Sequence, residues 1–134
     1  MAELSFMTIH ELSAAMNEGE ISSTDIIERC LSQIAAQEEQ LQAFVTVYSE
    51  EARLAAQAAD LAMAAGNRLG PLHGIPIALK DIIDMEGRVT TGGSMVWRER
   101  ISPTTATIAR RLNEVGMIVI GKTHSVEFAM GGWG

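Results

Sequence analysis

Residues 70–84 read Gly-Pro-Leu-His-Gly-Ile-Pro-Ile-Ala-Leu-Lys-Asp-Ile-Ile-Asp, and this stretch decides the class of fold. A loop rich in Gly and Pro leads into an apolar segment at 75–81 that has the composition of a strand. Pro76 stands near the start of that strand, where a missing N–H costs least. Side chains alternate between the two faces of a strand, so Lys80 lies on the face opposite the bulky residues. Those bulky residues are Ile75, Ile77 and Leu79.

Helix and strand signals alternate on both sides of this segment. Thr8 and Glu11 have the spacing of a capping box, in which the two side chains cap the start of a helix. A second group of capping residues stands at 22–25. This order of elements is typical of an α/β domain. The sequence predicts helices at 8–19, 23–39, 50–65, 102–115 and 125–128, and further strands at 44–48 and 117–120.

The composition excludes several classes of protein. Of 134 residues, 47% are hydrophobic and 20% are charged, which is typical of a globular protein and argues against disorder. The net charge of −7 and the thin spread of basic residues argue against direct binding to nucleic acid. No apolar run is long enough for a bilayer, and the N-terminus lacks the pattern of a signal peptide. The single Cys allows no internal disulfide, which fits a reducing cytoplasm. We therefore expect a soluble cytoplasmic protein with no membrane partner.

The predicted sheet is too small to stand alone. Three or four strands leave bare edges, and the segment 117–120 is apolar on both faces, so it needs cover from both sides. Aromatic residues make up only 4% of the chain, and the Ala-rich stretch 52–65 needs a neighbouring surface. We therefore expect a piece of a larger α/β core, whose partner is the remainder of the same polypeptide. A homo-oligomer stays open.

Lys80 has the most informative position of the ionisable residues. It lies at the carboxyl end of a predicted strand, which is where ligands bind in α/β sheets. A lysine that is buried there loses its charge more easily and can act as a general base. The alternative is a lysine that marks the exit of the strand into solvent.

The other reactive residues do not form a site by their spacing. Ser94 follows two glycines, a pattern more typical of a turn than of a nucleophile, and no His lies at a familiar spacing from it. Cys30 falls on the apolar face of a predicted helix and is interpreted as a core residue. The three His residues, His10, His73 and His124, lack the spacing of a metal site. Neither a metal nor a cofactor is therefore predicted.

Five blocks in the same order resemble the amidase signature family. Residues 70–84 resemble the strand that carries the catalytic lysine, and 89–94 (Val-Thr-Thr-Gly-Gly-Ser) resemble the glycine-rich loop. Residues 107–116 resemble the helix that follows, and 118–123 the next strand. The Glu-Phe-Ala-Met-Gly block at 127–131 resembles the turn that lines the substrate pocket. The resemblance therefore implies an α/β/α fold with a mixed central sheet, which is incomplete in this chain.

The resemblance also implies a mechanism. Enzymes of this family cleave amides with a triad of a serine, a second serine in a cis peptide, and a lysine. Lys80 then corresponds to the lysine base, and Asp81 shapes the exit of the strand rather than reacting. Met130, Gly131 and Gly132 are expected to bind the substrate, a small-molecule amide, and no cofactor is needed.

The segment that carries both serines lies downstream in the family, and this chain ends at Gly134. We expect 1–134 to be the N-terminal portion of one amidase domain, inactive by itself. Residues 1–66 are then a helical region with one strand, and 67–134 are the start of the signature core. Ser94 lies in the wrong block to be the nucleophile.

Two other functions stay open. The first is the amidase subunit of a tRNA-dependent amidotransferase, which would need partner subunits. His124 stands where many relatives have Asn, and Gly132-Trp133 replace the small serines of those subunits, which slightly favours a small-molecule amidase. The second alternative is a non-catalytic α/β interaction module.

Overall fold

The computed structural model describes residues 4–132, and its elements follow the expected α/β order. The three strands are β1 (Phe44–Val47), β2 (Pro76–Lys80) and β3 (Ile118–Thr123). The four α-helices are α1 (Ile9–Glu18), α2 (Ser23–Leu41), α3 (Ser49–Ala64) and α4 (Thr107–Glu114). Short 3-10 helices occupy Leu4–Phe6, Met95–Trp97 and Glu127–Ala129. No helix within residues 4–132 combines the length and the apolar character that a membrane span requires.

The first two helices begin at the caps that the sequence predicted. Thr8 accepts a hydrogen bond from the Glu11 backbone N–H, and the Glu11 carboxylate accepts one from the Thr8 backbone N–H. Ser22 and Asp25 form the same reciprocal pair at the start of α2. These contacts satisfy backbone N–H groups that a helix start otherwise leaves free.

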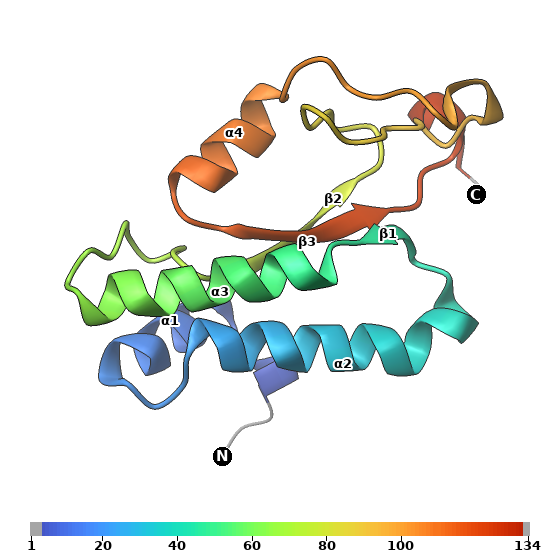
Figure 1. Ribbon diagram of the computed structural model, residues 1–134. Helices are drawn as coiled ribbons and strands as arrows, with labels where there is room; N and C mark the ends of the chain where they lie inside the picture. Colours follow the sequence, from blue (N-terminus) through green and yellow to red (C-terminus); the bar gives the residue numbers. More distant parts are fainter. Residues whose placement is uncertain (1–3, 133–134) are drawn as a thin grey trace.

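The sheet is mixed, as expected, with β3 in the centre. Its order is β1-β3-β2, with β2 parallel to β3 and β1 antiparallel to it. Figure 1 shows α2 and α3 side by side below this sheet, and α4 with the segment between β2 and α4 above it. The β2 and β3 strands run in the same direction, so their carboxyl ends meet at one end of the sheet.

A β-bulge interrupts the pairing of β2 with β3. Ile77 pairs with Val119, but the next residue of β2, Ala78, pairs with Gly121. The β3 strand therefore contains one extra residue, Ile120. Such an insertion reverses the face onto which the following side chains point, relative to a regular ladder.

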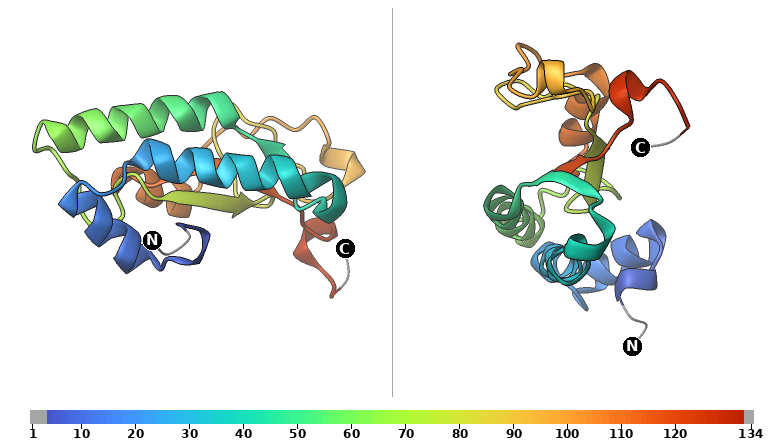
Figure 2. Two further views of the ribbon diagram at one scale, coloured as in Figure 1. Left: turned by 90° about the horizontal axis from the view of Figure 1, so that it is seen from below. Right: turned by 90° about the vertical axis from the view of Figure 1, so that its right-hand side faces the viewer.

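The main core lies between the sheet and the pair α2 and α3. Figure 2 shows these two helices together on one side of the strands. A second cluster joins α1 to the start of β2, where Leu12, Met16 and Ile75 are buried together. Helix α3 packs its buried Ala side chains against β3, which is the neighbouring surface that the sequence predicted it would need. The main core consists of Ile27, Leu31, Ala52, Ala56, Ala59, Ile118 and Ile120.

Three predicted elements were wrong in part. The helix expected at 125–128 is a 3-10 turn at Glu127–Ala129, because Phe128 has a left-handed backbone with a φ angle of 49°. Helix α4 begins at Thr107 rather than at 102, because Ser102 is occupied elsewhere. The Ser102 backbone N–H donates to the carbonyl oxygen of Arg88 at 2.8 Å, so Ser102 belongs to a bridge between loops. Strand β3 runs past the end at 120 that the apolar run predicted and reaches Thr123, as the resemblance implied, because it pairs with β1 and β2 over that length.

Candidate active site

Lys80 lines a pocket of about 590 Å³ at the carboxyl end of β2. Its side chain is exposed, and it makes no hydrogen bond or ion pair with the described residues. The position is the one at which ligands bind in α/β sheets, because strand ends and the loops after them converge there. The other lining residues are Leu41, Gln42, His124, Ser125, Val126, Gly131 and Gly132.

The pocket brings Lys80 together with two of the three residues expected to bind substrate. Gly131 and Gly132 line the same pocket as Lys80, although they lie about fifty positions away in the sequence. Met130 does not line it, and its side chain is 81% exposed. Trp133, which the sequence also singled out, lies outside the described residues.

The turn that precedes these glycines has an unusual backbone. Phe128 and Ala129 have φ angles of 49° and 57°, in the left-handed region that L-residues rarely adopt. The Phe128 N–H donates to the carbonyl oxygen of Gly92 at 2.6 Å, and its ring meets the Trp97 ring edge-on with 5.0 Å between centroids. The glycine-rich loop therefore holds the turn that leads to the pocket.

Ser94 also takes part in the contacts between the glycine-rich loop and the turn at 127–129. Its side chain is buried, and its Oγ donates to Glu127 Oε1 at 2.7 Å and accepts from the Val96 N–H at 3.3 Å. Ser94 does not line the pocket of Lys80. The hydroxyl thus ties the glycine-rich loop to the turn at 127–129.

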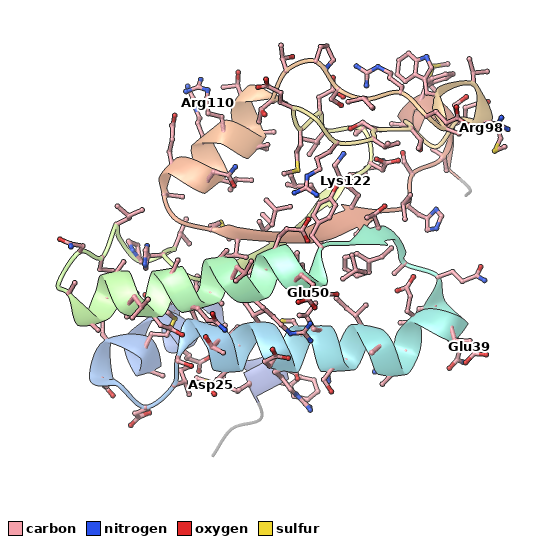
Figure 3. The ribbon with its side chains drawn as sticks, in the orientation of Figure 1. Asp25, Glu39, Glu50, Arg98, Arg110 and Lys122 are labelled. Atoms are coloured by element: carbon pink, nitrogen blue, oxygen red, sulfur yellow. The ribbon has the colours of Figure 1, made fainter. Side chains whose placement is uncertain are left out.

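The second lysine of the chain, Lys122, is buried. Figure 3 shows its side chain pointing from β3 away from α2 and α3, towards the loops on the other face. Lys122 Nζ donates to Thr90 Oγ1 at 2.9 Å and lies 3.4 Å from Asp81 Oδ1, and both charged side chains are 1% exposed. Burial lowers the pKa of Lys122, and the neighbouring Asp81 carboxylate opposes that shift.

Asp84 and Arg100 extend this polar network towards the surface. The Arg100 guanidinium donates to both carboxylate oxygens of Asp84, at 2.7 and 2.8 Å, and Ser102 Oγ donates to Asp84 Oδ1 at 2.8 Å. These donors, Arg100 first, lower the pKa of Asp84 to about 2. Ser102 Oγ also lies 2.9 Å from Thr90 Oγ1, which links this pair to Lys122.

Sequence patterns did not reveal this network. The apolar run at 117–120 predicts a strand that ends before Gly121, and the resemblance extends that strand to 123 without giving Lys122 a role. The signal that could have found the network is a lysine that follows an uninterrupted apolar run, together with polar residues at 81, 84 and 90. Each of those residues meets the others only after the sheet has formed.

The His and Cys residues are dispersed. His10 and His124 are exposed, and buried His73 places Nε2 3.1 Å from the carbonyl oxygen of Ala59. Cys30 packs against the main core, as predicted, and burial raises the pKa of its thiol. In the part of the chain that the structure describes, no three His, Cys, Asp or Glu side chains are placed to hold a metal ion.

Comparisons with known proteins place the chain in one family. The family model described as Amidase matches residues 25–133. The A subunit of glutamyl-tRNA(Gln) amidotransferase from Moorella thermoacetica is 43% identical over 129 residues, which are 96% of this chain and 26% of that protein. The protein of the same name from Halorhodospira halophila is 43% identical over 124 residues, or 92% of this chain and 25% of that protein.

Solved structures give the same result. The native peptide amidase of Stenotrophomonas maltophilia superimposes with a TM-score of 0.86 and 33% identity, over 92% of this chain and 26% of that enzyme. An amidase family protein from Bacillus anthracis superimposes with a TM-score of 0.84 and 25% identity, over 92% of this chain and 25% of that protein. The chain therefore spans about a quarter of the length of the relatives it matches. On the match of the family model to most of its residues, the chain belongs to the amidase signature family.

Proposed function

We propose that these 134 residues are the N-terminal quarter of an amide-bond hydrolase, to which they contribute the general base Lys80. The observation that carries the proposal is the pocket in which Lys80 meets Gly131 and Gly132 at the carboxyl end of β2. Coverage of about a quarter of each relative supports the view that the remaining three quarters supply the rest of the active site.

The proposed reaction is acyl transfer through a serine. A serine from the remainder of the protein attacks the amide carbonyl carbon, and its proton passes through a second serine to the neutral amine of Lys80. The C–N bond then breaks, and the proton returns from Lys80 to the departing amine. Water attacks the acyl-enzyme in the second half and releases the acid, with Lys80 again as the base.

Of the two lysines in the chain, the geometry favours Lys80 as the base. Lys122 is 1% exposed and is already bound to Asp81 and Thr90, whereas Lys80 lines the pocket and makes no polar contact with the described residues. A lysine acts as a base only as the neutral amine, which a desolvated environment favours. Lys80 is exposed within residues 4–132, so the proposal requires that the remainder of the protein cover the pocket.

The experiment compares the 134-residue chain with the full-length protein of the parent gene. Both are purified and assayed for hydrolysis of small aryl and alkyl amides, and quenched samples are weighed by intact mass spectrometry for an acyl adduct. We expect turnover and an adduct from the full-length protein only. An adduct on the 134-residue chain would show that a nucleophile lies in these residues.

A second candidate is the amidase subunit of a tRNA-dependent amidotransferase. The observation in its favour is the name carried by curated relatives that are 43% identical to this chain. Glutaminase activity of the full-length protein that depends on partner subunits, tRNA and ATP would favour this candidate. Hydrolysis of small amides by the protein alone would favour the stand-alone enzyme.

A further inference from the structure

We propose that Lys122 is a positioning residue for Lys80. It acts through Asp81, the neighbour of Lys80 in the chain, and holds the carboxyl end of β2 in place. The inference rests on the proposed role of Lys80 as a base and adds the residue that sets its geometry.

The bulge in β3 places Lys122 for this task. Because of the extra residue in β3, Lys122 pairs with Leu79 rather than with Lys80, and so shares the face of Leu79 and Asp81. Without the bulge, Lys122 would point with Ile120 towards α2 and α3. Bulges are frequent next to active sites, where they redirect a side chain.

Asp81 is fixed on three sides. Its N–H donates to the carbonyl oxygen of Thr123 at 2.9 Å, and its own carbonyl oxygen accepts from the Gly92 N–H at 2.9 Å. Its carboxylate accepts from the Thr91 backbone N–H at 3.1 Å through Oδ2 and faces Lys122 through Oδ1. The Asp81 side chain thus joins β3, the glycine-rich loop and the end of β2.

Lys80 has no such support of its own. Within the described residues its side chain makes no polar contact, so its position depends on the backbone that carries it. That backbone is held by Asp81 on one side and by a hydrogen bond from the Ile83 N–H to the Lys80 carbonyl oxygen, at 3.0 Å. A base that is shifted by about 1 Å loses about 100-fold in rate, so the support of Asp81 affects catalysis directly.

Lys122 could instead serve only to neutralise a buried carboxylate. In that case the removal of both charges should restore a normal protein, since replacing a buried ion pair by neutral groups is often harmless to stability. A positioning role predicts something different. The double variant recovers stability, because no charge is left unpaired, but does not recover the rate, because the link to Asp81 is gone.

The test uses the full-length protein with four variants: Lys122→Met, Asp81→Asn, the double variant of both, and Arg100→Met as the matched control. The control removes a cation from the same polar network at the Asp84 pair, away from the end of β2. Amide hydrolysis gives kcat and KM, and thermal unfolding gives Tm. We expect Lys122→Met to lower kcat about 100-fold with KM little changed, and the control to keep the parental kcat.

The double variant gives the decisive comparison even if Lys122→Met fails to fold. A parental Tm with kcat still about 100-fold down supports positioning. A double variant with parental kcat overturns it, and so does a folded Lys122→Met with parental kcat. Lys80→Ala, measured alongside, separates the two proposals. If Lys80→Ala keeps parental activity, the proposed function itself fails. If Lys80→Ala is inactive while Lys122→Met is active, only the positioning role is refuted.

Discussion

Gly93→Ala is a sharp test of how the glycine-rich loop packs against the segment after β3. Gly93 has a φ angle of +70°, and a Cβ at this position would lie 2.3 Å from the carbonyl oxygen of Ser125 and 2.9 Å from that of Val126. Both contacts are with backbone atoms, which cannot rotate out of the way as a side chain could. The two segments would have to separate, and both Ser125 and Val126 line the pocket of Lys80.

Gly92 provides a matched control one residue away. Its φ angle is +61°, but a Cβ there would meet only the side chains of Phe128 and Trp97, at 3.4 Å. Both variants share the left-handed backbone, which costs about 1–2 kcal/mol for an L-residue. Only Gly93→Ala adds overlap with the backbone, which costs about 1–3 kcal/mol more by analogy with overpacked cores.

The assay is urea unfolding of the full-length protein and of each variant, followed by tryptophan fluorescence and circular dichroism. We expect Gly92→Ala to lose about 1–2 kcal/mol of unfolding free energy and Gly93→Ala about 2–5 kcal/mol. Replacing Gly by Ala also lowers the conformational entropy of the unfolded chain, which adds to the free energy of unfolding. This contribution is the same for both variants and cancels when they are compared. Equal losses for the two variants would refute the close approach of Gly93 to Ser125.

Two further predictions concern stability. Arg100→Met removes the main donor that holds the pKa of Asp84 at about 2, against 3.8 for an unperturbed aspartate. The folded pKa lies below the unfolded one, so the pair stabilises the protein above about pH 4 and loses this effect as the pH falls towards 2. We expect the free energy of unfolding in urea to be about 1–2 kcal/mol higher for the parental protein than for the variant at pH 7, discounted for partial exposure. The difference should fall to about a third of that near pH 2.5, where folded Asp84 is still partly ionised, and an equal difference at both pH values would contradict the ion pair. Gly121→Ala places a Cβ 2.4 Å from the Thr46 carbonyl oxygen, so it should cost about 1–3 kcal/mol by the same assay. A loss below about 0.5 kcal/mol, as for a surface substitution, would contradict the tight pairing of β1 with β3 at Gly121.

Local signals in the sequence were sufficient for most of the elements. The capping residues Thr8 and Ser22 fixed where α1 and α2 begin, because a cap involves contacts only three residues apart. The strand at Pro76–Lys80 was predicted from its apolar composition and its Gly/Pro flank. The start of α4 was predicted too early, because Ser102 resembles a cap but is bound to loops that are distant in the sequence.

The site could be predicted only in part, for the same reason. Lys80 could be found because a lysine at the end of an apolar strand stands out, and the resemblance placed the glycines at 131 and 132 near it. The environment of Lys122 could not be found, because it depends on a bulge in β3 and on loops that meet only in the folded chain. The apolar pattern of a single strand does not show a bulge, which arises only when the strand pairs with its neighbour.

We propose that Lys80 is the base that this chain contributes to an amidase. The most direct measurement is kcat/KM for amide hydrolysis by full-length Lys80→Ala and Lys80→Arg beside the parental protein, with Tm as a control for folding. We expect a loss of about 1,000-fold or more for both variants at unchanged Tm, because Ala has no base and Arg keeps its proton. A folded Lys80→Ala variant with nearly parental kcat/KM would show that Lys80 is not the base.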